Sequence, residues 1–214
     1  MDATGAMATG WIHDGKSWYY LDSAGHPAGN GWSLIGSSWY YLSGGRVATG
    51  WLYDAGSWYY LNAATGAMAT GWVQVDGQWY FLRSSGAMVT GWMNGGGPWY
   101  YLTGSGAMAT GWLYDNGSWY YLDATNGAMA TGWFQDGTTW YYSSSSGAMM
   151  TGWLNGGSSW YYLSGSGAMV TGWLHLGSSW YYMGGSGAMV TGTQVVDGHR
   201  STFESSGRWV GYAS

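Results

Sequence analysis

The chain has 214 residues, of which 20% are aromatic, only 7% are charged and 41 are glycine, a composition unlike that of an ordinary globular domain. The net charge is -5 with five Lys and Arg in total, which excludes the basic surface that nucleic-acid binding requires. Cysteine is absent and no apolar run approaches the roughly 18 residues of a membrane span, so we expect neither disulfides nor membrane insertion.

The first ten residues read as part of a repeat. Residues 3–11 have the sequence ATGAMATGW, which is identical to residues 64–72. We therefore expect residues 1–10 to be a partial repeat at an excised boundary, without a signal peptide.

Residues 11–192 hold nine copies of an aromatic unit of about 20 residues. A tryptophan opens each copy and a second follows seven residues later, and these two sets contain 18 of the 19 tryptophans. Such a period is typical of a repeat array, in which each copy buries apolar surface only against its neighbours. The opening tryptophans are Trp11, Trp32, Trp51, Trp72, Trp92, Trp112, Trp133, Trp153 and Trp173, and the second ones are Trp18, Trp39, Trp58, Trp79, Trp99, Trp119, Trp140, Trp160 and Trp180.

Each copy reads as two short strands around a glycine turn. Asp14-Gly15 lies between β-forming residues, which favours a hairpin because the turn positions need positive φ. In Asp115-Asn116-Gly117 the glycine comes one residue later, which indicates a three-residue turn or a bulge. A two-residue turn would set the two tryptophans of a copy opposite each other, with the last tyrosine of Trp-Tyr-Tyr on their face and the first tyrosine on the other.

A single hairpin is marginally stable in water, so the hairpins are expected to stack. The sequence thus predicts an all-β fold, a β-solenoid of stacked β-hairpin repeats. Residues 193–214 form an atypical C-terminal capping repeat, in which Thr193 and Arg200 stand where the two tryptophans are expected. A polar terminal copy lets a repeat array end solubly. Trp209 stands at the usual methionine position and is expected to fill the last groove.

The tryptophan pairs indicate a binding site as well as packing. Indoles are costly core fillers, because their N–H needs a partner and aliphatic residues would pack as well. Two tryptophans of one copy and a tyrosine of the next would form a box open on one side. Without a carboxylate inside, such a box suits a quaternary ammonium ion held by the ring quadrupoles, or the apolar face of a sugar. The regular methionines either line these boxes or pack beside them; they are Met68, Met88, Met108, Met129, Met149, Met169 and Met189.

No set of residues supports catalysis or metal binding. The one glutamate, Glu204, lies in the atypical last copy, and no pair of carboxylates, Ser-His-Asp set or ligand cluster recurs. The aspartates at the hairpin tips are explained as turn residues. We expect no enzyme activity, no metal and no cofactor.

The pattern Gly-Trp, Gly, Trp-Tyr-Tyr-Leu, Gly-Ala-Met and Thr-Gly resembles the choline-binding repeats, also called cell-wall-binding repeats, of bacterial surface proteins and lysins. The resemblance covers residues 3–192, and the segments 196–200 and 206–210 are similar to the tail that often ends these modules. It implies a β-solenoid in which two tryptophans of one hairpin and a tyrosine of the next hold choline. Carried onto this chain, the implied boxes are Trp11, Trp18 and Tyr41; Trp32, Trp39 and Tyr60; Trp51, Trp58 and Phe81; Trp72, Trp79 and Tyr101; Trp92, Trp99 and Tyr121; Trp112, Trp119 and Tyr142; Trp133, Trp140 and Tyr162; and Trp153, Trp160 and Tyr182. Phe81 departs from the pattern but keeps a ring face, and a ninth set, Trp173 and Trp180, meets Thr202 in place of a ring.

The function implied by the resemblance is non-catalytic anchoring to the bacterial cell surface by a secreted module that binds choline-decorated teichoic acid or another cell-surface polymer. A homodimer is compatible with the sequence. Two other functions stay open. One is a glucan-binding repeat module, since the glucan-binding repeats of secreted glucosyltransferases have a similar aromatic and glycine content. The other is a structural spacer or self-associating adhesin whose boxes are filled by protein.

Overall fold

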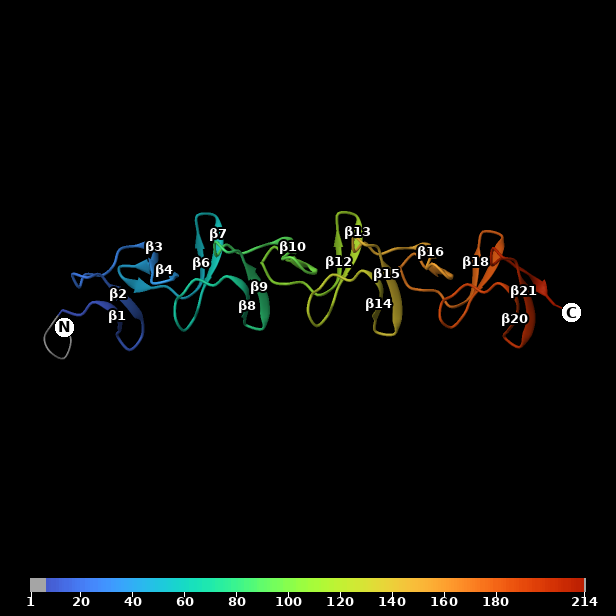
Figure 1. Ribbon diagram of the computed structural model, residues 1–214, viewed down its shortest axis with the longest axis horizontal. Coiled ribbons are helices and arrows are strands. Elements are labelled where there is room, and N and C mark those ends of the chain that lie inside the picture. Colours follow the sequence, from blue (N-terminus) through green and yellow to red (C-terminus); the bar gives the residue numbers. More distant parts are fainter. Residues whose placement is uncertain (1–6, 214) are drawn as a thin grey trace. The chain divides into compact units, whose positions relative to one another are not determined.

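The computed structural model describes residues 7–213, so the start of the expected partial repeat, residues 1–6, lies outside the described residues. In the described range no helix is long and apolar enough to cross a membrane. The chain divides into two compact units, Met1–Ala109 and Thr110–Ser214, which are drawn in blue to green and in green to red (Figure 1).

The first unit is built from five hairpins. The strand β5 lies between β2 and β4, so the first two hairpins form one five-stranded sheet in the order β1-β2-β5-β4-β3. The other hairpins, β6/β7, β8/β9 and β10/β11, are separate two-stranded sheets. The strands are β1 (Gly10–His13), β2 (Trp18–Leu21), β3 (Gly31–Ile35), β4 (Ser38–Ser43), β5 (Arg46–Val47), β6 (Gly50–Asp54), β7 (Ser57–Leu61), β8 (Gly71–Val75), β9 (Gln78–Leu82), β10 (Gly91–Asn94) and β11 (Trp99–Leu102).

The second unit has four two-stranded hairpins and ends in a three-stranded sheet of order β20-β21-β22. Successive hairpins of this unit point in different directions, and β12/β13 and β18/β19, which are three hairpins apart, point the same way (Figure 1). The prediction of an all-β stack of hairpins is confirmed. The strands are β12 (Gly111–Asp115), β13 (Ser118–Leu122), β14 (Gly132–Asp136), β15 (Thr139–Ser143), β16 (Gly152–Asn155), β17 (Trp160–Leu163), β18 (Gly172–Leu176), β19 (Ser179–Met183), β20 (Gly192–Val196), β21 (His199–Phe203) and β22 (Trp209–Tyr212).

The predicted three-residue turns are wrong. Asp115 pairs directly with Ser118, and the two residues between them, Asn116 and Gly117, have φ of 46° and 82°. Two consecutive residues of positive φ make a type I′ turn, whose twist matches that of the flanking strands. Where glycine comes one residue earlier, as at Gly137 with φ 59°, the turn also has two residues but needs positive φ only at the first of them.

The predicted strand register is also wrong, by two residues. Trp112 lies opposite Tyr121, and Tyr114 lies opposite Trp119. The two tryptophans of a hairpin are therefore diagonal neighbours. Because side chains alternate along a strand, Trp112, Trp119 and Tyr121 still share one face, as expected.

The core of each unit runs through the residue that follows Trp-Tyr-Tyr, not through the tryptophans. That residue has an exposed fraction of 0% in Leu42, Leu61, Leu82, Leu102, Leu122, Ser143, Leu163 and Met183. The second tryptophan of each hairpin, in contrast, is 41% to 45% exposed. Half-exposed indoles contribute less to the core than buried leucines, so the conspicuous rings are available for contact with a ligand.

Within each unit, return segments tie neighbouring hairpins together. Met68 follows β7, and its amide donates a hydrogen bond of 2.8 Å to the carbonyl of Trp39 on β4 of the preceding hairpin. Gly86, in the next return segment, lies so close to the side chain of Met68 that a Cβ there would be 2.2 Å from its sulfur. Met68 is thus enclosed between one hairpin and the following return segment.

Candidate functional site

Within the two units, aromatic rings of neighbouring hairpins meet at the junctions. Trp51 on β6 and Trp58 on β7 have ring centroids 6.4 Å apart and planes at 88°. Tyr80, on β9 of the next hairpin, lies 4.7 Å from Trp51 at 67°. The opening tryptophan and the first tyrosine of the next hairpin make the same contact, at 4.8 to 5.0 Å, in the pairs Trp11–Tyr40, Trp32–Tyr59, Trp72–Tyr100, Trp112–Tyr141, Trp133–Tyr161 and Trp153–Tyr181.

Three of these junctions contain cavities, open to solvent, of about 240, 230 and 430 Å³. Each is lined by the two tryptophans, the first tyrosine of the next hairpin, a methionine of the following return segment and one or two serines. Cavities of this size suit a small organic group rather than an extended ligand. The lining residues are Trp32, Trp39, Tyr59, Met68, Ser84 and Ser85 in the first; Trp51, Trp58, Tyr80, Met88 and Ser105 in the second; and Trp153, Trp160, Tyr181, Met189, Ser205 and Ser206 in the third.

In six hairpins the two tryptophans have ring centroids 6.2 to 6.4 Å apart, and the three cavities are closed by a different tyrosine from the one assigned from the sequence. The second tyrosine of each Trp-Tyr-Tyr run, or phenylalanine in one copy, lies 5.1 to 5.4 Å from the opening tryptophan of its own hairpin, not of the preceding one. The third members assigned from the sequence are therefore corrected as box-closing rings: Tyr41, Tyr60, Phe81, Tyr101, Tyr121, Tyr142, Tyr162 and Tyr182.

The reason for this correction is the alternation of side chains. Consecutive hairpins meet with opposite faces, so the tryptophan face of one hairpin contacts the first-tyrosine face of the next. The second tyrosine shares the tryptophan face and points toward the following junction. The members of the predicted group Trp92, Trp99 and Tyr121 divide between the two units, and within its own unit Tyr121 lies 5.1 Å from Trp112.

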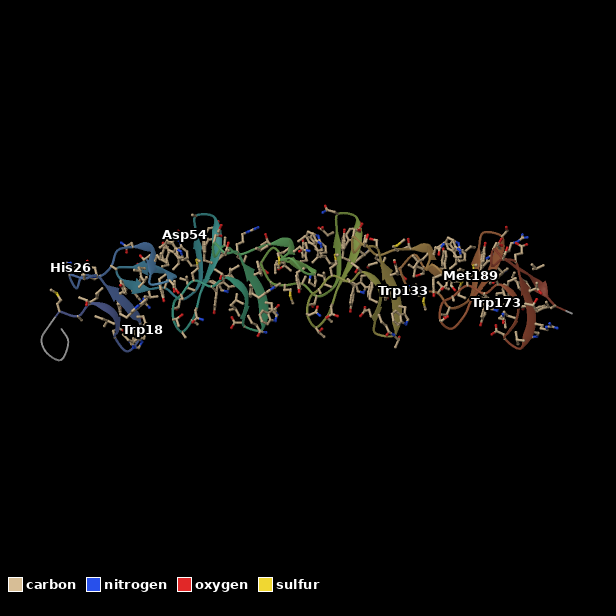
Figure 2. The ribbon with its side chains drawn as sticks, in the orientation of Figure 1. Trp18, His26, Asp54, Trp133, Trp173 and Met189 are labelled. Carbon is tan, nitrogen blue, oxygen red and sulfur yellow. The ribbon has the colours of Figure 1, made fainter. Side chains whose placement is uncertain are left out.

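Three of the methionines in the return segments are walls of the boxes. Met68, Met88 and Met189 line the three cavities, and Figure 2 labels Met189 beside the hairpins it joins. The amide of Met189 donates to the carbonyl of Trp160 at 2.8 Å, which holds the backbone of the return segment against the hairpin of Trp160. Of the two predicted roles for these residues, lining and packing, the structure supports both.

Carboxylates at the hairpin tips form contacts that sequence reasoning missed. The indole Nε1 of Trp32 donates to Asp54 of the next hairpin at 3.0 Å, and the Nε1 of Trp112 donates to Asp136 at 2.9 Å (Asp54 is labelled in Figure 2). The Nε1 of Trp173 donates to Asp197 at 3.0 Å. These aspartates therefore do more than shape their own turns. The sequence feature that could have indicated this role is their position. Asp54 and Asp136 each follow an opening tryptophan by three residues, on the strand face that contacts the preceding hairpin.

The hydrogen bonds of Asp14 and Asp136 shift pKa values in opposite directions. Asp14 keeps the expected turn role, accepting the amides of Ser17 and Lys16, and these hydrogen bonds lower the pKa of its carboxyl. Burial raises the pKa of Tyr121, and its hydroxyl donates to Asp136 at 3.2 Å, which raises that pKa further. Asp136 thus accepts from two rings of the preceding hairpin.

The terminal junctions differ from the interior ones. Trp173 and Trp180 form the usual pair at 6.2 Å, but Thr202 lies opposite Thr193. Trp209 takes the expected place in the last groove, 5.5 Å from Trp173. At the first junction Val47 stands in the position of the usual methionine, and the neighbouring Arg46 donates to the hydroxyl of Ser17 at 3.0 Å.

Within residues 7–213, no group of three or more His, Cys, Asp or Glu side chains is arranged to hold a metal ion. The chemistry that recurs at the junctions is that of electron-rich ring faces with a thioether wall and a few hydroxyls.

Comparison with known proteins gives consistent matches. Residues 29–70, 69–110, 89–134 and 130–171 match the choline-binding repeat, and residues 9–26 and 171–189 match the putative cell wall binding repeat. No curated protein matches the chain.

Solved structures from Streptococcus pneumoniae are similar over nearly the whole chain. CbpJ is 40% identical with a TM-score of 0.83, over 96% of this chain and 81% of CbpJ. Choline-binding protein F is 40% identical with a TM-score of 0.79, over 93% of this chain and 77% of its own. The modular autolysin LytC, solved with a synthetic peptidoglycan ligand, is 34% identical with a TM-score of 0.63, over 95% of this chain and 48% of LytC.

Proposed function

Because the chain belongs to the choline-binding repeat family, we propose that it is a cell-wall-anchoring module whose aromatic boxes bind the choline groups of teichoic acid. Each box uses the two tryptophans of one hairpin, the first tyrosine of the next and a methionine. The proposal includes a location at the bacterial cell surface, and binding rather than turnover as the activity of this chain. LytC is a modular autolysin, so modules of this kind also occur within enzymes.

The observation that carries the proposal is the repeated cavity of three ring faces with no charged residue among its lining side chains. A trimethylammonium group cannot donate a hydrogen bond, and the negative faces of indole and phenol rings attract its charge. Choline-binding protein F has been solved in complex with ipratropium, which is itself a quaternary ammonium ion. It has also been solved in the presence of a peptidoglycan analogue, which supports a cell-wall polymer as the partner.

The energetics favour many weak sites. A cation–π contact contributes on the order of 0.5–2 kcal/mol, so three rings supply roughly 2–6 kcal/mol before the entropy of association is subtracted. A single box is therefore expected to bind choline with a dissociation constant of about a millimolar. A polymer carrying many cholines would present later contacts at a high effective concentration, so avidity supplies the strength of anchoring.

The direct test is a choline titration followed by tryptophan fluorescence and by thermal unfolding. Choline at about 100 times its dissociation constant stabilises by about 2.7 kcal/mol per independent site, so the melting temperature should rise with choline concentration and the emission should change over the same range. The control is the neutral isostere of choline, in which a tert-butyl group replaces trimethylammonium, and it should have a much weaker effect.

The open alternatives predict other results. Retention on dextran together with indifference to choline would replace this proposal with glucan binding. Dimerisation without ligand, with tryptophans that choline and quenchers cannot reach, would replace it with a self-associating spacer.

A further inference from the structure

The opening tryptophans fall into two groups according to the partner of their indole N–H. Trp32 and Trp112 donate to Asp54 and Asp136, at 3.0 and 2.9 Å, and Trp173, at the terminal junction, donates to Asp197 at 3.0 Å. Asp54 and Asp136 each lie at the end of the first strand of the next hairpin, so the carboxylate meets the N–H edge of the ring that forms one wall of a box.

Trp51 and Trp153 represent the other group. The residues in the position of Asp54 and Asp136 are Val75 for the junction of Trp51 and Leu176 for the junction of Trp153. Across residues 7–213, no protein group accepts a hydrogen bond from either of these two indoles. The boxes of Trp32, Trp51 and Trp153 otherwise share the same ring set and a methionine wall.

We propose that Asp54 and Asp136 are positioning and specificity residues, which make the boxes of Trp32 and Trp112 tighter and more cation-selective than those of Trp51 and Trp153. The inference rests on the proposed function and assigns a difference among its sites. A carboxylate that accepts from the indole N–H holds the ring in one rotamer, so less side-chain freedom is lost when the ligand binds. Its negative charge also attracts a cation on the ring face, whereas it does not attract a neutral ligand of the same shape.

The test has to distinguish this role of Asp54 and Asp136 from a purely structural one. Asp54 and Asp136 both connect neighbouring hairpins, and Asp136 also accepts from the Tyr121 hydroxyl at 3.2 Å. An asparagine in the same place keeps an oxygen acceptor for the indole but loses the charge. An alanine loses both, so the pair of variants divides hydrogen bonding from electrostatics.

The experiment is a choline titration of the full chain in which the indole N–H signals are resolved by two-dimensional NMR. The signals of Trp32 and Trp112 should reach half-saturation at lower choline than those of Trp51 and Trp153. Asp54→Asn should raise the midpoint of Trp32 roughly 3–10-fold and leave the midpoints of Trp51 and Trp112 unchanged. Val75→Asp should lower the midpoint of Trp51 by a similar factor.

Asp14→Asn is the matched control, because Asp14 has the same place in its hairpin but accepts from the amides of its own turn. It removes the same formal charge and should leave every midpoint unchanged. In titrations with the tert-butyl isostere, the Asp54→Asn and wild-type midpoints should coincide.

Two outcomes overturn the inference. One is an Asp54→Asn protein that binds choline like the wild type while Asp54→Ala binds it weakly, which assigns Asp54 a structural hydrogen bond alone. The other is equal midpoints for all the indoles of the wild-type chain. If none of the indole signals responds to choline, the failure belongs to the proposed function and not to the difference between its sites.

Discussion

At the scale of single residues, adjacent tyrosine positions have different neighbours. Tyr80 lies against Trp51 of the preceding hairpin at 4.7 Å, whereas Phe81 lies against Trp72 of its own hairpin at 5.2 Å. The first ring of each Trp-Tyr-Tyr run therefore closes the box of the preceding hairpin. The second ring packs against the opening tryptophan of its own hairpin. Only the first is a direct wall of the cavity that contains Trp51 and Trp58.

Replacing Tyr80 tests this division. Tyr80→Leu removes one ring face from the box of Trp51 and Trp58 and should weaken choline binding there by roughly 2–30-fold, the equivalent of about 0.5–2 kcal/mol. Tyr80→Phe keeps the face and should stay within about 2-fold of the wild type. The midpoint of the Trp51 indole signal in a choline titration measures both. Phe81→Leu is the control for loss of an adjacent ring, and a larger shift of the Trp51 midpoint with Phe81→Leu than with Tyr80→Leu would reverse the assignment.

The tryptophans of each box could be predicted from the sequence, because their period is regular and their spacing is fixed. The closing tyrosine was also within reach, since hairpins stacked in one direction must meet with unlike faces; the prediction erred by taking every ring from the tryptophan face. Asp54 is different. No local pattern separates it from Asp14, which accepts only from its own turn. The indole that donates to Asp54 belongs to another hairpin, so the contact depends on how the hairpins stack.

At the scale of the elements, the return segments hold the stack together. The amide of Met88 bonds to Trp58 of the preceding hairpin at 2.8 Å, and Gly106 of the next return segment would place a Cβ 2.2 Å from the sulfur of Met88. Glycine is required at position 106 for two reasons: its φ is +84°, and no space remains for a side chain. The predicted hairpins were confirmed, but the turn lengths were not, since a residue such as Ala55 adopts a φ of 47° where glycine or asparagine is usual.

Three alanine substitutions in one unit separate these two requirements. Gly104 has no positive φ and an added Cβ would meet nothing within 4 Å, so Gly104→Ala should change the unfolding free energy by less than about 0.5 kcal/mol. Gly91 has φ +78° and equal space, so Gly91→Ala should cost about 1–2 kcal/mol from backbone strain alone. Gly86 has φ +82° and contacts Met68, so Gly86→Ala should add about 1–3 kcal/mol of overpacking to that strain.

Urea unfolding monitored by tryptophan fluorescence gives these differences as shifts of the midpoint. Equal losses for Gly86→Ala and Gly91→Ala would mean that Met68 moves aside freely, and the enclosed methionine would then contribute nothing to the stack.

At the scale of the whole chain, the number of boxes matters more than the strength of any one. Seven junctions described within the two units repeat the contact between an opening tryptophan and the first tyrosine of the next hairpin. The net charge of -5 gives no general attraction to an anionic polymer, so under the proposed function retention on such a polymer has to come from choline groups held one by one. Affinity for free choline and retention on a choline polymer should therefore respond differently to the loss of boxes.

Stepwise removal of closing rings tests this dependence on number. Tyr59→Leu, Tyr80→Leu and Tyr181→Leu each weaken one of the three boxes that contain a cavity. These substitutions are made singly, in pairs and all together. In every variant, the affinity of the unchanged boxes for free choline should stay the same. The dissociation rate from a surface densely coated with choline should instead rise by a similar factor at each step, because every lost contact removes one intramolecular binding event. A single variant that abolishes retention would identify one dominant site, and a triple variant that dissociates like the wild type would show that these boxes do not anchor the chain.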